Sequence, residues 1–327
     1  YTLYKMQSLL AFYIKYTLPL FLIFVLILRS DAFGFFLMPI SILILFLPAL
    51  TKRHKLLIIA LTIVVLFADL GARSNVLKFS FPILFMLIYY VREKISTKHI
   101  EYLRISLFIL PILFFVLGVS NVFNVFKMDE YLDGDYTSTG VNEKGERVEQ
   151  NVIVDTRTFL YEEVLESAIY NNYWLLGRTP ARGNDSETFG FVDGSLTGRN
   201  ERITNEIGLA NVFTWTGLVG VILYSLIFYR ASFLAVRKSK NIYVKILGVY
   251  VAFRWLYSWV EDVNKFSINY FMLMIVIGMC FSISFRKMNN NEFTVWVRSI
   301  FDIRYLKYRY YLVEKRKEKS NVEVKNI

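Results

Sequence analysis

Long uninterrupted apolar runs are the feature of this sequence that most restricts how the chain can fold. Several runs extend for about 16 to 23 residues, which is roughly the helix length that crosses the apolar core of a bilayer. Hydrophobic residues make up 55% of the 327 residues, and mean hydropathy is +0.41. Helices of soluble proteins instead alternate apolar and polar faces. We therefore expect an all-α integral membrane protein, folded as a polytopic helical bundle.

The runs predict eight spans, and they are listed here with their approximate bounds: Leu9–Leu28, Ala32–Leu50, Leu56–Leu70, Val76–Val91, Ile105–Phe126, Ile207–Phe228, Ile242–Trp259 and Phe266–Phe285. The chain is thereby divided into spans one to five (1–126), a hydrophilic loop (127–205), spans six to eight (206–286) and a basic tail (287–327). No charged segment with a cleavage site precedes the first run, and residue 1 is Tyr, so we expect further spans before this sequence.

Basic residues predict the orientation of the spans. They cluster after the second, fourth and sixth spans and in the tail, which are alternate segments and therefore share one side. The positive-inside rule makes that side the cytoplasm, so the C-terminus is expected to be cytoplasmic. The loop 127–205 holds more acidic than basic residues and falls on the opposite, extracytoplasmic face. The turn that contains Gly71 to Ser74 and the turn 259–262 fall on that face too.

The net charge of +11 does not indicate a nucleic-acid partner, because the basic residues border the apolar runs, where they set orientation and contact membrane lipids. The single cysteine, Cys280, cannot form an intrachain disulfide. Both histidines, His54 and His99, lie in cytoplasmic loops, which excludes a histidine-based external active site. The sequence has no metal-ligand spacing and no nucleotide fingerprint, so no metal and no cofactor is expected.

The external loop is expected to divide into two parts. Turns or a short hairpin are predicted for 129–150, and a helix capped by Thr156 is predicted from Asp155 onward, ending at the stop Gly177–Pro180. Its apolar stripe consists of Leu160, Val164, Leu165 and Ile169. In the tail, aromatic and basic residues alternate over 293–311, which predicts a helix lying on the cytoplasmic leaflet.

Three segments, in order, resemble the O-antigen polymerase and O-antigen ligase family of bacterial envelope glycosyltransferases. The first is Gly71-Ala72-Arg73-Ser74 at the external end of a span. The second runs from Arg157 through Glu162 and Ala168 to Trp174-Leu175-Leu176-Gly177. The third is Asn205-Glu206 followed by Gly217-Leu218-Val219-Gly220.

The resemblance implies a membrane enzyme that takes a polyprenyl-diphosphate-linked glycan on the outer face of the bacterial cytoplasmic membrane and transfers it to an acceptor glycan or lipid. It also implies that a flippase and a chain-length regulator work beside it. The product would be a surface polysaccharide such as O-antigen, capsule or exopolysaccharide.

The resemblance and the chemistry of the leaving group together assign the arginines. A departing diphosphate gains negative charge, and guanidinium groups offer paired donors that stay protonated at any working pH. Arg73, at a span end, and Arg157, at the start of the loop helix, are the main candidates for binding diphosphate or glycan. Further candidates for the same role are Arg178, Arg182, Arg199 and Arg202. The competing interpretation for each is a solvated or snorkelling side chain.

Two carboxylates are candidates for catalysis. The ligase branch of the family carries a histidine just before the third motif, and here Glu206 or Asn205 stands in its place, which favours a polymerase over a ligase. Glu206 could act as general base if burial raised its pKa. Glu261 lies at an external span end, where a capping role is the alternative. Arg254, inside a span, is expected to pair with Glu261 or Asp262, or to bind substrate.

Two other functional classes stay open. A transporter of lipid-linked glycan or solute would usually carry charge in the middle of its spans, whereas here most spans lack it and the polar mass is external. A noncatalytic assembly scaffold would not need Arg73 and Arg157 together on one face.

Overall fold

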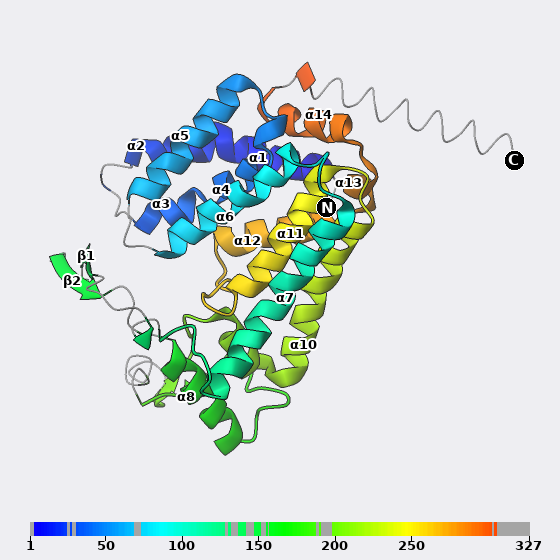
Figure 1. The fold of residues 1–327 in the computed structure, drawn as a ribbon. Helices are drawn as coiled ribbons and strands as arrows, with labels where there is room; N and C mark the ends of the chain where they lie inside the picture. The colour runs from blue at the N-terminus through cyan, green and yellow to red at the C-terminus, as the bar shows by residue number, and fades with distance from the viewer. Residues whose placement is uncertain are drawn as a thin grey trace, which may run out of the picture. The chain divides into compact units, whose positions relative to one another are not determined.

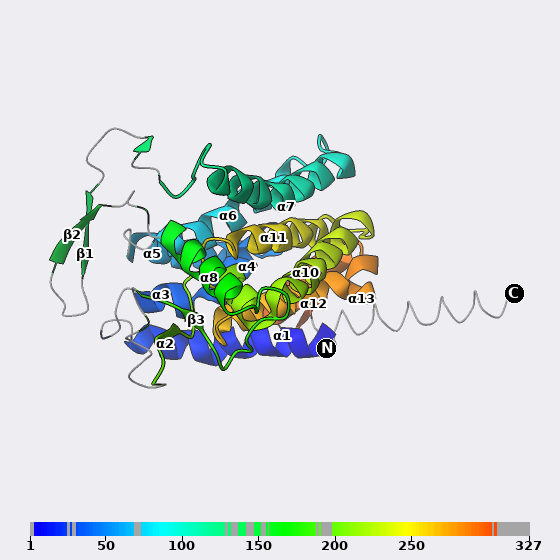
Figure 2. The same cartoon turned by 90° about the horizontal axis from the view of Figure 1, so that it is seen from below.

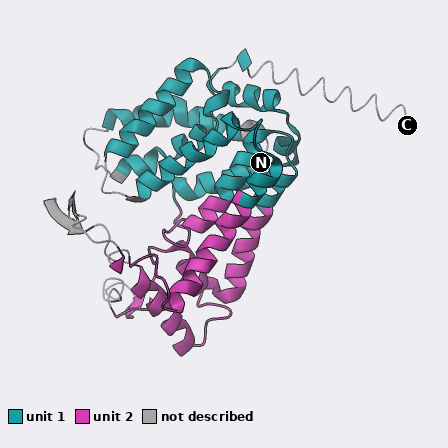
Figure 3. Cartoon of the chain, viewed as in Figure 1, with its two compact units in different colours: residues 1–102, 231–251, 267–327 teal, residues 103–230, 252–266 magenta. Residues whose placement is uncertain are grey.

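The protein is described by a computed structural model that covers residues 3–24, 27, 31–68, 73–127, 130–131, 137–141, 147–151, 155, 157–187, 190, 198–302 and 304–305. The described chain is mostly helical (Figure 1). It divides into two compact units made of discontinuous segments (Figure 3). Unit 1 holds Tyr1–Tyr102, Ala231–Val251 and Ser267–Ile327, and unit 2 holds Leu103–Arg230 and Ala252–Phe266.

Unit 1 consists of helices, whose bounds are α1 Leu3–Phe12, a π-helix Tyr13–Thr17, α2 Leu18–Phe24, α3 Asp31–Phe36, α4 Met38–Leu45, a 3-10 helix Leu47–Ala49, α5 Lys52–Ala68, α6 Arg73–Tyr90, α12 Ile268–Phe281, α13 Ile283–Lys287 and α14 Asn290–Phe301. Helix α4 forms the centre of this unit, because all eight of its residues are buried. Helices α5, α6 and α12 pack around it.

Helix α14 differs from the expected helix on the cytoplasmic leaflet. It begins with a capping box, in which Asn289 and Glu292 each accept the other's backbone N–H. Its apolar face is buried inside unit 1, where Phe293 packs on Phe46 and the Trp296 carbonyl accepts a hydrogen bond from Gln7 of α1. The prediction of a surface helix was therefore wrong for 290–301, because the protein covers the apolar face itself. Residues 306–311 lie outside the described residues.

Unit 2 contains the described residues of the loop 127–205 and parts of three long helices. These helices are α7 Thr97–Val119, α10 Gly208–Arg237 and α11 Ile242–Tyr257, and each also extends into the segments of unit 1. The loop contributes β1 Thr137–Val141, β2 Arg147–Asn151, α8 Thr158–Tyr170, β3 Asn184–Asp185 and β4 Glu201–Arg202. Strands β1 and β2 pair antiparallel, as do β3 and β4. The first pair confirms the hairpin expected within 129–150.

The helices of unit 2 pack through aromatic side chains. Phe108 of α7 contacts Tyr229 of α10 and Trp255 of α11, with ring centroids 5.4 and 4.9 Å apart. Figure 2 shows the same three helices from below. The loop has its own small core, in which Leu160 and Val164 of α8 meet Ile207 and Ala210 at the start of α10.

Three described helical stretches are long and apolar enough to cross a membrane: Met6–Phe24, Thr97–Val119 and Gly208–Arg237. They indicate a membrane protein. The other predicted spans correspond to shorter helices, or, over 32–50, to a run divided among α3, α4 and a 3-10 turn. The eight-span topology stays a prediction.

One predicted span end was wrong, and one helix is longer than the span predicted for it. The fifth span was expected to reach Phe126, but α7 ends at Val119, because Asn121 adopts a positive φ of 54° and the chain folds back onto the carbonyl of Leu117. The sixth was expected to end at Phe228, but α10 continues to Arg237.

The loop helix also differs from expectation at both ends. Its first amides are bound by Asp155, whose Oδ1 accepts from the backbone of Arg157 and Thr158 at 2.8 and 3.0 Å. Asp155 therefore caps α8, and the predicted cap, Thr156, lies outside the described residues. The helix ends at Tyr170, before the predicted stop at Gly177, because Asn172 takes a positive φ of 54°.

Candidate functional site

The predicted site residues do not all gather in one place. Arg157, Arg202 and Glu206 meet in unit 2, and Arg178 lies in a second polar group of the same unit. Arg73 is the first residue of α6 in unit 1, and its side chain lies outside the described part of the structure.

Arg157 and Arg202 share the carboxylate of Glu206. Arg157 Nη1 donates to Glu206 Oε2 at 2.6 Å, and Arg202 Nη2 lies 3.8 Å from Oε1. The Glu206 side chain is 56% exposed, whereas those of Arg157 and Arg202 are only 22% and 12% exposed. We call these three residues the Glu206 group. It combines two largely covered guanidinium groups with one carboxylate that solvent reaches, and it carries one positive charge in excess.

The position of Arg157 is fixed from both sides. Its backbone precedes α8, where Asp155 binds its amide, and its Nε donates to the carbonyl of Val260 at 3.2 Å. Burial alone would raise the pKa of the Asp155 carboxyl, but hydrogen bonds from the Thr158 side chain and from the backbone of Thr158 and Arg157 lower it below its usual value. Tyr161, one turn along α8, donates to the carbonyl of Trp259 at 2.6 Å. The segment 259–260 therefore holds both the helix and the guanidinium.

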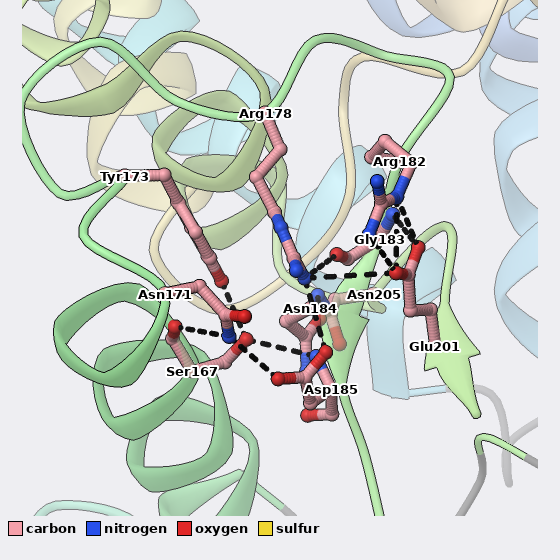
Figure 4. Close-up of polar contacts among 10 residues, drawn as sticks. All are labelled: Ser167, Asn171, Tyr173, Arg178, Arg182, Gly183, Asn184, Asp185, Glu201 and Asn205. Atoms are coloured by element: carbon pink, nitrogen blue, oxygen red, sulfur yellow. Dashed lines mark hydrogen bonds and ion pairs between the residues drawn. The ribbon is translucent and has the colours of Figure 1, made fainter. Parts of the chain in front are cut away.

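A second polar group surrounds Arg178 and is drawn in Figure 4. Arg178 Nη1 donates to the Gly183 carbonyl and to Asp185 Oδ1, both at 3.0 Å, and its guanidinium lies over the ring of Tyr173. Arg182 Nε donates to both carboxylate oxygens of Glu201, at 3.0 and 2.9 Å. These hydrogen bonds from Arg182 hold the pKa of Glu201 below its usual range. We call these residues the Arg178 group.

Short strands and buried amides position the Arg178 group. Asp185 pairs with Glu201 in β3 and β4, so both carboxylates come from adjacent backbone positions. Three buried asparagines link β3 to α10: Asn205 donates to Oδ1 of Asn184 in β3 at 2.8 Å, and Asn211 of α10 exchanges two hydrogen bonds with the Asn205 backbone. Through these asparagines the Arg178 group is linked to the start of α10, so we assign it a structural role in holding the loop against this helix.

Glu261 and its neighbours lie between α11 and α12. The Glu261 carbonyl accepts from Gly208 at 3.2 Å, which places it at the start of α10. Burial raises the pKa of the adjacent Asp262, whose Oδ1 accepts from the Asn264 backbone. Arg254 is fully buried, with its guanidinium over the ring of Tyr257. Its expected pairing with Glu261 or Asp262 stays a prediction.

Glu206 is not a buried carboxylate, because its side chain is 56% exposed. Burial raises the pKa of Asp262 instead, but its Oδ2 is enclosed by protein.

An apolar cavity of about 490 Å³ lies beside Arg157 within unit 2. Its walls come from α7, the turn after α7, α8 and the segment 256–260, and are mostly aliphatic and aromatic. Thr158 and Val260, the neighbour and the carbonyl partner of Arg157, both line it. Glu162 and Glu166 of α8 add carboxylates to the lining. Such a volume falls in the range of small-molecule sites.

Several residues of the site were not predicted from the sequence. Asp185 and Glu201 lie in strands of only two residues, which are too short to show the alternation of apolar and polar residues that predicts a strand. Asn184, Asn205 and Asn211 looked like ordinary loop or helix residues, apart from Asn205 beside Glu206. The buried state of Asp262 depends on packing that no local pattern shows.

Among the residues that the structure describes, no three His, Cys, Asp or Glu side chains gather so that they could hold a metal ion. The chain matches no protein-family model, no curated protein and no solved structure.

Proposed function

We propose that this chain is a membrane glycosyltransferase that polymerises polyprenyl-diphosphate-linked oligosaccharide repeat units of a surface polysaccharide. The observation that supports it is the Glu206 group, in which two arginines meet on one half-exposed carboxylate beside an apolar cavity. A lipid-linked diphosphate needs both features at once, namely paired guanidinium donors and an apolar surface.

The Glu206 group suits a diphosphate because its arginines are held in place before a ligand arrives. Arg157 is fixed by Val260 and α8, so little side-chain freedom is lost on binding. Phosphate oxygens accept paired guanidinium hydrogen bonds, which are stronger than neutral ones. An incoming diphosphate would take over donors that now bind Glu206, and the exposed carboxylate can turn away into solvent.

The proposed reaction uses both the positive and the negative side chains of the Glu206 group. An acceptor hydroxyl oxygen attacks the anomeric carbon of the donor sugar and forms the new glycosidic bond. The bond from that carbon to the diphosphate oxygen breaks, and the diphosphate leaves with the electron pair, stabilised by Arg157 and Arg202. Glu206, displaced from the arginines but still beside them, accepts the hydroxyl proton; this role rests on its place next to the leaving group and not on burial, since its side chain is 56% exposed. The cavity beside Arg157 holds a section of the isoprenoid chain.

The first experiment replaces Arg157 and Arg202, singly, with Ala and with Lys in the native host, at equal membrane levels, and resolves surface polysaccharide by length on a gel. We expect the ladder to collapse to single repeat units on their acceptor, with Lys rescuing little because it cannot bind in a bidentate way. Loss of one transition-state contact typically lowers the rate by about 10²- to 10³-fold.

Lys127→Ala is the matched control, because it removes an exposed cation from the same loop, and its side chain pairs with Glu130 and not with Glu206. An unchanged ladder in the Arg157 and Arg202 variants would refute the arginine mechanism. Accumulation of lipid-linked polymer with an empty surface acceptor would instead support ligation.

A further inference from the structure

Helix α10 is interrupted at Gly217. This residue has φ 63° and ψ −166°, a backbone conformation open essentially to glycine alone. A Cβ at this position would lie 2.3 Å from the backbone of Leu175. The chain before Gly217 and the chain after it are therefore two helical segments joined at a close contact with the external loop.

The backbone of loop segment 174–179 supplies hydrogen-bond partners for the α10 amides and carbonyls that the break at Gly217 leaves without helical partners. Leu218 and Val219 donate to the carbonyls of Trp174 and Leu175, at 2.9 and 3.2 Å. In return, the carbonyls of Thr214 and Trp215 accept from Arg178 and Thr179, at 2.8 and 3.0 Å. In an unbroken helix Leu218 would bind Thr214 and Val219 would bind Trp215. The loop is thus bonded into the helix and held at the level of Gly217.

The surroundings of α10 change at this level. Before Gly217 the helix is mostly buried: Leu209, Ala210 and Val212 are all covered, and Ala210 packs in the small core with α8. After Gly217 it has an exposed apolar face formed by Leu218, Val219, Ile222, Leu223, Leu226 and Ile227. The remaining stretch to Arg237 is about 20 residues, or about 30 Å at 1.5 Å per residue, which equals the thickness of a bilayer core.

The loop segment 169–176 carries its own exposed apolar side chains. Ile169, Tyr170 and Leu176 are 69%, 85% and 71% exposed, and Trp174 and Leu175 are 48% and 44% exposed. This segment contains no charged residue, and the next one along the chain is Arg178. Five exposed apolar side chains on a segment of eight residues indicate that this segment contacts another apolar surface.

We propose that segment 169–176 lies in the outer interfacial layer of the membrane, so that the bilayer begins at Gly217 and not at Ile207. We assign lipid as the partner of this surface. The segment is bonded to Leu218 and Val219, and the exposed apolar face of α10, which is long enough to cross a bilayer, begins at these two residues. Tyr and Trp are the side chains that membrane interfaces favour. This inference concerns membrane depth and does not depend on the proposed reaction.

Spin-label depth measurements test the inference on the whole chain in phosphatidylcholine–phosphatidylglycerol vesicles. In a Cys280→Ala background, single nitroxide labels are placed at Tyr170→Cys and Leu176→Cys, with Leu223→Cys as the lipid reference and the exposed Ala181→Cys as the solvent reference. Both loop labels are expected to collide several-fold more often with oxygen than with a water-soluble nickel chelate, as the Leu223 label does. The Ala181 label is expected to show the reverse.

Nickel-chelate accessibility at Tyr170 and Leu176 equal to that at Ala181 would overturn the inference. Spin–spin broadening between loop labels of different molecules would also overturn it, since a second copy would then cover the surface. Both positions are largely exposed, so labelling them should leave the packing intact. The measured collision rates do not depend on enzymatic activity.

Discussion

At the scale of residues, two groups of arginines on the same loop differ in what they leave open to a ligand. In the Arg178 group the guanidinium hydrogen bonds go to Gly183, Asp185 and Glu201; the Asp185 side chain is 46% exposed, but Glu201 is covered. In the Glu206 group the shared carboxylate is more than half exposed. An anionic ligand can therefore displace Glu206 at little cost, whereas displacing Glu201 would leave a covered charge without its partner.

The Glu201→Gln variant tests the structural role of the Arg178 group. Losing the bidentate contact with Arg182 is expected to cost about 1–2 kcal/mol of stability, reduced by the partial exposure of Arg182. Because Arg182 lowers the pKa of Glu201, this contribution is fully present above the unfolded pKa of about 4.3 and is lost as the pH falls through the lower folded value.

Thermal unfolding in detergent from pH 7 down to pH 3 measures this contribution. The difference between wild type and Glu201→Gln is expected at pH 7 and should shrink at the acidic end. The exposed Glu187→Gln is the control and should match wild type. A deficit of equal size at every pH would contradict the ion-pair explanation.

The sequence predicted part of this chemistry at the level of residues. Arg157, Arg202 and Glu206 were candidates, and the structure brings them together, although their roles stay predictions. The sequence did not predict that Arg178 is bound by Asp185, because that contact depends on pairing between two-residue strands. Such pairing follows from tertiary packing and leaves no periodic pattern.

At the scale of elements, the break in α10 is the feature that joins the loop to this long helix. At Gly217 the backbone of this helix approaches the backbone of the loop and not another helix, because a Cβ there would meet Leu175 and Leu176. The sequence could not predict this break, because apolar residues continue on both sides of it. The break is stabilised by hydrogen bonds from the backbone of 174–179, a contact between distant parts of the loop and the helix that no local sequence pattern shows.

The Gly217→Ala variant tests the break. The backbone conformation alone should cost a non-glycine residue about 1–3 kcal/mol, and the clash with Leu175 adds to it. We expect a lower thermal midpoint, measured by the folded fraction that survives heating in detergent on size exclusion.

Gly118→Ala is the matched control for this variant, since its Cβ would approach nothing closer than the Phe123 carbonyl at 4.0 Å. If Gly217→Ala were as stable as this control, α10 would be able to run straight, and the hydrogen bonds to the loop would be dispensable.

At the scale of the whole molecule, the sequence predicted a helical membrane protein with a large loop, and three membrane-length helices agree with this. The number of spans was harder to predict, because apolar runs such as 32–50 also form buried, broken helices inside a unit. Hydropathy alone does not distinguish burial in protein from burial in lipid.

The predicted orientation can be tested by labelling cysteines in intact cells. In the Cys280→Ala background, Ala181→Cys in the loop should react with a membrane-impermeant maleimide. Lys238→Cys, just after the basic end of α10, should react only after permeabilisation, as the positive-inside rule requires. The opposite pattern would invert the topology and place the loop in the cytoplasm.

The interruption at Gly217 also bears on how the protein tolerates hydrophobic mismatch. An unbroken α10 would be about 45 Å long, well beyond a bilayer core of about 30 Å, and would have to tilt as one rod. With the joint at Gly217 at the membrane surface, as inferred above, only the segment of about 30 Å after it has to fit the bilayer, and the loop stays bonded at the joint. The arginines of the loop would then keep a constant height above the lipid surface in membranes of different composition.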